Sequence, residues 1–479
     1  MAAATTVSPG DDTESDGGGA GAGADGDGRR GAVLGVPRER FDVITSQALP
    51  VMGGMVSQNV LNLVDAAMVA SLGTAVVAAV GVGSNVNFQA QACVQSLGAG
   101  VTAMSARRVG AGAEQEARAA EPLNAALALA AIVGTAIGAV MFWAAPTYIA
   151  AIQSDPQVLA AAVPYLQARL LAVPAVGMNY SFRGYWNACG QPKVYLHTIT
   201  SMHAANIVLS FALIFGVPGL GIPALGVLGA GLGTTASTWF GTLLYFRQGF
   251  MRARARGFMA AMPSLATVRT LGGLSISQAL TTTLYASGMT VLFWIIGRIG
   301  TVELGAANVL LNLLLVVALP CWGMGLSAGA LAGRAMGRGD PEDADKWVWQ
   351  VARLTSALMA LCGLVFVAFP DMLLKPFLAD EVARAAAVAP LRMVGAAVCI
   401  DSAGAVMQSA LSGVGAARTV AIASFLSQWC VFLPLAYYIA IVKGCSLTQL
   451  WAVYTLSRIG NALLFTALWR TKRWQRIKL

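Results

Sequence analysis

Residues 57–68 read SQNVLNLVDAAM and place Asp65 inside an apolar run that begins near Val43. A charged side chain at the centre of a bilayer costs about 2.5–3.5 kcal/mol on insertion scales, so such residues are rare and face a protein interior or a wet cavity. Gln58, Asn62 and Asp65 are spaced i, i+4 and i+7, and they therefore share one helical face. We expect this face to lie inside a helix bundle within a membrane.

The composition also indicates a membrane protein. The chain has 479 residues, of which 57% are hydrophobic and only 11% are charged, whereas soluble domains carry about 25% charged residues. The net charge of +9 does not indicate a nucleic-acid partner, because the basic residues lie between apolar segments and form no stripe with aromatic residues. The seven cysteines include no CxxC pair, and no Walker A or HExxH motif is present, so we expect no metal site, no cofactor and no enzyme.

The apolar segments predict an all-α integral membrane protein, since one span needs about 20 mostly apolar residues. We expect about twelve spans, near 42–66, 76–106, 122–145, 158–187, 194–216, 226–249, 265–297, 304–334, 346–370, 384–413, 418–442 and 448–470. Lys and Arg gather in the connections after the even-numbered spans, which predicts that both termini are cytoplasmic. The expected location is a plasma membrane or a bacterial inner membrane.

The two halves of the chain repeat. SLGTAVVAAVGV (71–82) aligns with RIGTVELGAANV (298–309), and the same offset pairs Arg107 with Arg334. Each repeat has an even number of spans, so we expect two six-helix lobes related by pseudo-two-fold symmetry along the membrane normal. The predicted parts are a disordered Gly/Ala/Asp-rich tail (1–40), an amino-terminal lobe (41–249), a basic linker (250–264), a carboxy-terminal lobe (265–470) and a basic tail (471–479).

This ordered series resembles the multidrug and toxic compound extrusion (MATE) family. The resemblance rests on a proline followed by Asp65 in the first span, on ARRVGAGAEQEA (106–117), and on its echo LAGRAMGRGDPEDA (331–344). FRGYWNACGQPKVYL (182–196) is most similar to the DinF-like branch. The resemblance implies secondary active efflux of organic solutes by rocker-type alternating access, in exchange for H⁺ or alternatively Na⁺. It also implies that the carrier works as a monomer, with a small organic substrate and membrane lipid as its partners.

In the DinF-like branch, the amino-terminal lobe holds a cation site made by an Asp of the first span, an Asn and an Asp of the fifth, and a Thr of the sixth. Asp65, Asn206 and Thr234 match three of these positions, and Pro50 matches the proline that lets the first span bend. Ser210 stands where the second acid is expected. One carboxylate fewer weakens the case for Na⁺ and favours a proton on Asp65. A permanent hydrogen bond of Asp65, for example to Arg169, is the alternative interpretation.

In the NorM-like branch, a second site in the carboxy-terminal lobe uses an acid of the seventh span and an Asp of the tenth. Asp401 matches the Asp, whereas Thr283 is the residue nearest to the missing acid. Asp401 could equally serve only to pack the lobe. The sequence therefore leaves open which lobe holds the coupling ion.

The expected substrate cavity is lined by polar, aromatic and basic residues of both lobes: Gln58, Asn62, Asn179, Tyr180, Arg169, Gln278, Thr283 and Arg392. If Arg169 or Arg392 faces the cavity, an organic anion becomes a plausible substrate, because a guanidinium binds carboxylates. Two other interpretations stay open. One is a lipid-linked oligosaccharide flippase of the same superfamily, and the other is a membrane scaffold or receptor without transport.

Overall fold

The computed structural model describes residues 32–378, 380–477 and 479, and most of the predicted disordered tail lies outside these residues. Residues up to Asp42 form a unit of their own, so the description below concerns the second unit, Val43–Leu479. Within the described residues the regular secondary structure is helical, apart from two isolated β-bridges.

The first half of the chain forms the helices α1 (Arg38–Ala70), α2 (Thr74–Gln95), α3 (Leu97–Gly110), α4 (Ala113–Glu116), α5 (Glu121–Ile152), α6 (Pro156–Leu170), α7 (Val173–Ala188), α8 (Pro192–Phe215) and α9 (Gly226–Arg252). The second half forms α10 (Leu265–Ile299), α11 (Thr301–Gly337), α12 (Pro341–Ala368), α13 (Pro370–Leu374), α14 (Glu381–Gly413), α15 (Ala417–Phe425), α16 (Leu433–Tyr437) and α17 (Leu447–Arg470). The π-helical segment η3 (Leu426–Phe432) joins α15 to α16, and a second, η4 (Tyr438–Val442), extends α16, so that residues 417–442 form one continuous helix.

Each predicted span corresponds to one helix or to consecutive helices, and the predicted fold class is confirmed. Seven of the described helices are long and apolar enough to cross a membrane, or eight if α6 and α7, which are bent by 48°, count as one span. The predicted second and fourth spans are each divided in two, at Ser96 and at Leu171–Ala172. Helix α1 begins at Arg38, earlier than the predicted start of the first span.

Short polar side chains fix where several helices begin. Asp155 accepts a hydrogen bond from the backbone of Gln157 at 2.8 Å, and Asp340 does the same for Asp343 at 2.8 Å. In both cases a proline follows the cap, where its missing N–H removes no helical hydrogen bond. Both caps lie in connections that the lengths of the apolar segments predicted.

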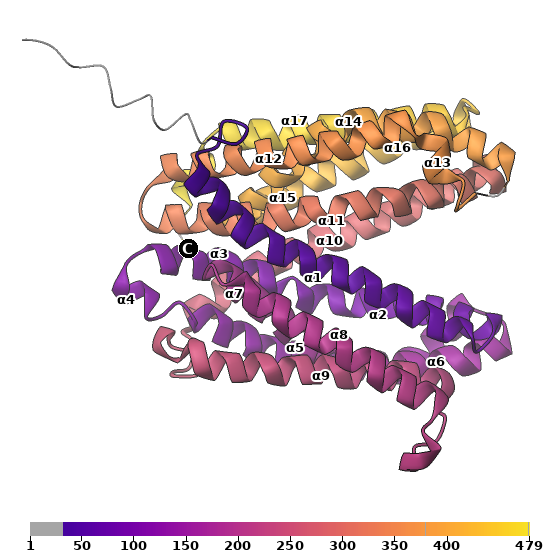
Figure 1. Ribbon diagram of the computed structural model, residues 1–479, viewed down its shortest axis with the longest axis horizontal. Helices are drawn as coiled ribbons and strands as arrows, with labels where there is room; N and C mark the ends of the chain where they lie inside the picture. Colours follow the sequence, from indigo (N-terminus) through magenta and orange to yellow (C-terminus); the bar gives the residue numbers. More distant parts are fainter. Residues whose placement is uncertain (1–31, 379, 478) are drawn as a thin grey trace, which may run out of the picture. The chain divides into compact units, whose positions relative to one another are not determined.

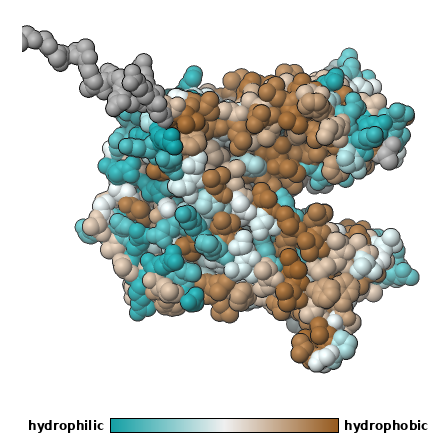
Figure 2. Space-filling view, viewed as in Figure 1, coloured by the Kyte–Doolittle hydropathy of each residue, from teal (hydrophilic) through white to brown (hydrophobic). Residues whose placement is uncertain are grey.

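The helices form two lobes, α1–α9 and α10–α17, and each lobe has its own core of buried apolar side chains (Figure 1). The first turns of α10 depart from this division, because Leu271 packs into the core of the amino-terminal lobe. Helix α3 lies against both α10 and α11 of the other lobe. Away from this contact the lobes separate, and Figure 2 shows a hollow between them on the opposite side.

Where the lobes meet, the two repeats make equivalent contacts. Arg107 donates to the carbonyl of Val414 at 2.9 Å, and Arg334 donates to the carbonyl of Ala188 at 3.3 Å. Ala188 is the last residue of α7, and Val414 directly follows the last residue of α14. The last carbonyls of a helix lack intrahelical partners and attract cations. The residues that the sequence repeat pairs thus make the same kind of contact in opposite lobes.

Two glycines let the backbones approach at the same place. A Cβ atom added to Gly110 would collide with the carbonyl of Arg334, and one added to Gly337 would collide with the carbonyl of Arg107. We call Arg107, Gly110, Arg334 and Gly337, with the helix ends that they contact, the interlobe clasp. The end of the bundle that holds it is called the basic end.

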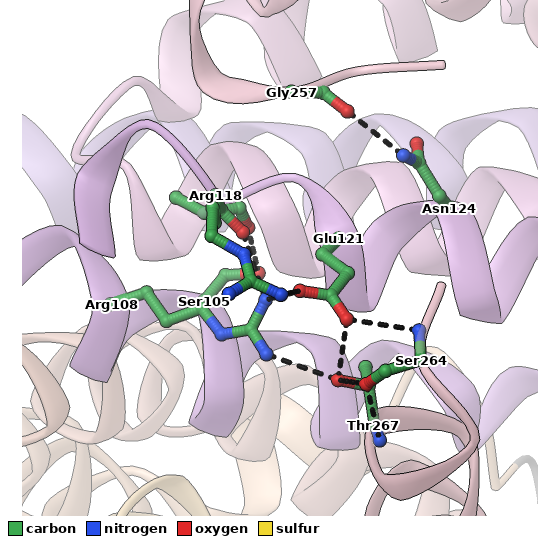
Figure 3. A network of polar contacts seen from close by, with 9 residues as sticks. Ser105, Arg108, Arg118, Glu121, Asn124, Gly257, Ser264 and Thr267 are labelled. Atoms are coloured by element: carbon green, nitrogen blue, oxygen red, sulfur yellow. Dashed lines mark hydrogen bonds and ion pairs between the residues drawn. The ribbon is translucent and has the colours of Figure 1, made fainter. Parts of the chain in front are cut away.

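A polar network at the basic end holds the start of α10 to the amino-terminal lobe (Figure 3). Glu121 accepts from Arg108 at 2.8 Å and from Arg118 at 2.9 Å. Its other oxygen accepts from the backbone of Ser264 at 3.1 Å and from the hydroxyl of Thr267 at 2.8 Å. One carboxylate therefore connects α3, α5 and α10, so the end of the predicted linker is anchored to the amino-terminal lobe.

Candidate functional site

The polar face predicted on α1 is present and is tied to α8, but it is not enclosed as expected: Gln58 and Asp65 are half-buried and Asn62 is exposed. Gln58 donates to Asn62 at 3.2 Å, as expected for residues one turn apart. The ring of His203 on α8 contacts both Ser57, at 2.7 Å from Nδ1, and Gln58, at 3.2 Å from Nε2. Sequence reasoning assigned no partner to His203, because nothing local to α8 indicates which helix lies opposite.

The depth of Asp65 follows from how α1 and α8 pack. Ser57 contacts His203, and Val69 and Ile214 share a small apolar cluster. The two helices therefore run in the same direction with the same rise per residue. By this register Asp65 lies level with Ser210.

Asp65 has a carboxylate oxygen, Oδ1, that is buried and has no hydrogen-bond partner among the described residues. Arg169 of α6 interacts with Asp65 electrostatically. No ion pair joins the two within the part of the chain that the structure describes, and the Nε of Arg169 is itself buried without a partner. Ten other buried side-chain atoms among the described residues also lack a partner, but Asp65 Oδ1 is the one carboxylate oxygen among them. An acid inside a membrane helix is by default a candidate functional group.

The predicted residues Asn206 and Ser210 belong to one hydrogen-bonded chain with α9. Asn206 donates to the hydroxyl of Ser237 at 3.1 Å, and Ser210 donates to the Asn206 oxygen at 3.4 Å. Thr234 takes part through its carbonyl, which accepts from Ser237 at 2.9 Å, while its own hydroxyl is bonded to Ala230. Sequence reasoning missed Ser237, although it lies one helical turn after Gly233, where α9 approaches Ser210 closely.

Two other residues predicted for the cavity of the amino-terminal lobe have neighbours of their own. Asn179 donates to the carbonyl of Thr238 at 3.1 Å and accepts from Thr242 at 2.9 Å, so its amide joins α7 to α9. The guanidinium of Arg183 lies over the ring of Tyr180, 4.3 Å from the ring centre. Pro50 is buried within α1, where it removes one helical hydrogen bond.

In the carboxy-terminal lobe, Asp401 of α14 forms an ion pair with Arg458 of α17, and the atoms Oδ2 and Nη2 are 2.8 Å apart. Sequence reasoning found no partner acid for Asp401 and weighed packing with polar residues of the same span, but it overlooked this arginine inside the last predicted span. Thr283 is exposed on α10, and no hydrogen bond joins it to Asp401 among the described residues. Gln278 is half-buried, and its backbone carbonyl accepts a hydrogen bond from the Thr282 hydroxyl at 3.1 Å.

Arg392 lies exposed on α14. Within the described residues no group of three or more His, Cys, Asp or Glu is placed to hold a metal ion. The letters GLSAG at 325–329 fit the GxSxG pattern of hydrolases, but they lie inside α11. There the Ser327 hydroxyl is buried and bonded to the Gly323 carbonyl at 3.1 Å, so this serine is not the exposed nucleophile of a strand-to-helix turn.

Comparisons with known proteins agree with this architecture. The family model MatE matches residues 50–212 and again residues 278–438, one match in each lobe. The "Multidrug resistance protein NorM" of Burkholderia vietnamiensis is 28% identical over 424 residues, which is 84% of this chain and 88% of that protein. "Multidrug resistance protein PmpM" of Pseudomonas aeruginosa is 24% identical over 311 residues, which is 64% of each chain.

Solved structures share the fold. The crystal structure of MATE in the bent conformation superposes with a TM-score of 0.83 at 19% identity, covering 90% of this chain and 95% of that one. The placement in the DinF-like branch is not tested by these matches and stays a prediction. The repeated family match, the two lobes and the apolar helices lead to one assignment. The chain belongs to the multidrug and toxic compound extrusion family, MatE, and is a multi-pass membrane transporter rather than an enzyme.

Proposed function

We propose that this chain exports small organic compounds in exchange for H⁺, with Asp65 as the group that takes up the proton. The names of the relatives NorM and PmpM support multidrug efflux as the process. The observation that carries the choice of residue is the buried, unpartnered Oδ1 of Asp65. A proton needs only one such oxygen, whereas Na⁺ binds several oxygen ligands at once, so H⁺ is the simpler coupling ion here.

The two lobes and the interlobe clasp support alternating access. Positive charge favours the cytoplasmic side, so we place the basic end and both termini in the cytoplasm. The hollow in Figure 2 then opens outward, and the clasp closes the path to the cytoplasm. Export requires a second arrangement in which the clasp is broken and the other end is closed, because the lobes rock about a central site.

Protonation of Asp65 changes the balance of charge inside the amino-terminal lobe. The ionised carboxylate is attracted to Arg169, and the neutral acid is not. His203 holds the middle of α1 to α8 at Ser57, while Pro50 leaves a gap in the helical hydrogen bonds before it. We infer that the loss of charge releases the part of α1 around Asp65 from Arg169 and changes the bend of α1 at Pro50. The cavity is altered as a result, so that proton and substrate bind in competition.

The test is accumulation of a fluorescent organic cation, the methyl ester of a rhodamine, in proteoliposomes. Each preparation is measured under an imposed pH gradient and, separately, under an imposed Na⁺ gradient. We expect the pH gradient to drive accumulation in the wild type and the Asp65→Asn variant to lose it. The control is Asp371→Asn, which changes an exposed acid in the short helix α13.

Full pH-driven accumulation in the Asp65→Asn variant would show that another group carries the proton. Accumulation driven by Na⁺ alone would show that the coupling ion is wrong. A normal Asp371→Asn variant confirms that the loss at Asp65 does not follow from removing any acid of the chain.

A further inference from the structure

The last residues of the chain, which the sequence predicts only as a basic tail, fold back onto the basic end. After α17 ends at Arg470, Lys472 has a left-handed backbone with a φ of 55°, which turns the chain, and the short 3₁₀-helix η5 (Arg473–Arg476) follows. The end of the chain, marked C in Figure 1, lies beside α3 of the amino-terminal lobe. We call residues 471–477 and Leu479 the carboxy-terminal strap.

One buried side chain anchors the strap in the carboxy-terminal lobe. Trp474 is 2% exposed, and its ring stacks on that of Trp469 in the last turn of α17, with 4.1 Å between the ring centres. The indole N–H of Trp474 donates to the Trp469 carbonyl at 2.8 Å. Trp469 in turn donates to Asp345 of α12 at 2.7 Å. Both indole N–H groups have the partner that a buried tryptophan needs, so the strap is fixed to two helices of one lobe.

The far part of the strap reaches the other lobe at the clasp. Arg107 of α3 donates through Nη1 to the carbonyl of Ile477 at 2.5 Å, and through Nη2 to the carbonyl of Val414. One guanidinium of the amino-terminal lobe thus holds both a helix end and the strap. Only two residues separate the Trp474 anchor from Ile477, so the strap cannot follow a departing amino-terminal lobe far.

The last side chain lies beside the clasp. Leu479 contacts Gly415, where an added Cβ would come within 2.8 Å of the Leu479 Cδ1 atom. Together with Met104 and Gly337, Leu479 borders a cavity of about 290 Å³. Leu479 is still 38% exposed, so this end of the strap is seated much less deeply than its Trp474 anchor.

The positive charge of the strap is not compensated by acidic partners. Lys472, Arg473 and Arg476 are exposed, and no ion pair within the described residues involves the strap. The strap therefore adds positive charge to an end of the bundle that already holds Arg107 and Arg334, and like charges repel. Docking depends on one buried ring, one backbone carbonyl and one partly exposed leucine, so the strap is poised to detach.

We propose that the carboxy-terminal strap keeps the basic end closed and thereby sets how often the transporter opens to that side. The strap is anchored in one lobe and bonded to the other, so its contact with Arg107 exists only while the lobes are together. A contact that is present in one arrangement and absent from the other shifts the equilibrium toward the first. The strap acts on the second arrangement of the lobes that the proposed function requires, so this regulatory role rests on that function.

The test is the rate at which a maleimide modifies Cys189 in the detergent-purified protein, followed by mass spectrometry of the peptide that contains it. Cys189 follows Ala188, whose carbonyl accepts from Arg334, so it belongs to the half of the clasp that the contacts of the strap given above do not include. A change in this rate therefore reports separation of the lobes and not the uncovering of a residue beneath the strap. The measurement needs neither a gradient nor a substrate.

Two variants release the strap in different ways. One ends the chain after Thr471, and the other, Trp474→Ala, keeps the length of the strap but removes its anchor. Each should raise the rate at Cys189 about 2- to 12-fold, as for the loss of one solvent-accessible hydrogen bond. The matched control is Arg476→Gln, which changes an exposed side chain of the strap and keeps its anchor and its carbonyls, so it should not raise the rate.

Transport gives a second readout. Under the proposed function, substrate enters from the basic end, and only the molecules that are open there can bind it. A larger open population should therefore lower the concentration of the rhodamine methyl ester that gives half-maximal accumulation in proteoliposomes, by a factor similar to that at Cys189.

The outcomes separate the role of the strap from the proposed function. An unchanged rate at Cys189 in a folded variant that lacks the docked strap would overturn the strap's role, and so would an equal rise in the Arg476→Gln variant. If the rate rises as expected but a pH gradient drives no accumulation of the ester in the wild type, then proton-driven export is wrong and the strap's role stands. If the rate rises while the half-maximal concentration stays the same, the strap still holds the basic end closed, and the entry of substrate from that end is wrong.

Discussion

Replacement of Gly337 by alanine should open the interlobe clasp. The added Cβ collides with the carbonyl of Arg107, which is backbone and cannot turn away as a flexible side chain could. Overpacking of this kind costs about 1–3 kcal/mol. The cost falls only on the arrangement in which the basic end is closed, so the open arrangement should gain about 5- to 150-fold in relative population.

The native Cys189 reports on this opening. It follows Ala188, whose carbonyl accepts from Arg334, and it is half-buried at the end of α7. The rate at which a maleimide modifies Cys189 in the detergent-purified protein can be followed by mass spectrometry of the peptide that contains it. We expect the rate to rise in the Gly337→Ala variant in proportion to the open population. Because the repeats are equivalent, Gly110→Ala should raise it by a similar factor.

A glycine elsewhere in α11 serves as the control. A Cβ added to Gly305 meets nothing within 4 Å, so Gly305→Ala should leave the rate at Cys189 unchanged. An unchanged rate in a folded Gly337→Ala protein would refute the reasoning, since it would mean that the close contact does not hold the basic end shut. A rise in the Gly305→Ala variant would show that Cys189 reports general loosening instead.

Two further substitutions test the polar contacts that position the helices. His203→Ala should weaken pH-driven export and lower the thermal stability, since it removes the hydrogen bonds of the His203 ring to Ser57 and Gln58. Leaving the Ser57 hydroxyl without its partner costs about 1–3 kcal/mol of stability. Normal export at normal stability would mean that this contact between α1 and α8 is dispensable. Glu121→Gln should lower the thermal unfolding temperature more than Glu116→Gln does, because Glu121 is the more buried carboxylate and serves two arginines; an equal effect of the two would contradict a special role for the network in Figure 3.

Periodicity along single helices is enough to predict part of the site. The shared face of Gln58 and Asn62 and the joint position of Asn206 and Ser210 follow from the helical repeat alone. Span positions are also predictable, because the length of an apolar segment is a local signal. Helix α1 nevertheless extends beyond the apolar run, since the bilayer limits the apolar part of a helix and not its full length.

Contacts between helices far apart in the sequence are not predictable in the same way. Which partner a side chain has depends on which helix lies opposite and at what height. This holds for the contacts of Ser237 with Asn206, of Arg458 with Asp401 and of His203 with Ser57. The repeat alignment is the exception, because it pairs Arg107 with Arg334 from the amino-acid sequence alone. Internal symmetry carries long-range information that a single helical pattern lacks.

The two lobes are alike in backbone and unlike in charge, and this difference bears on how export is coupled. The clasp preserves the symmetry, since Arg107 and Arg334 make equivalent contacts across it. The membrane-embedded acids break it: Asp65 keeps a buried oxygen free, whereas Asp401 is already paired with a cation. Protonation stabilises a buried carboxylate less when an arginine already forms an ion pair with it, as Arg458 does with Asp401, than when no ion pair is formed, as at Asp65. This difference supports the proposal that the proton is taken up in the amino-terminal lobe. The clasp is one contact that joins this lobe to the other, and Met52 of α1, which lies against Gly323 of α11, is a second.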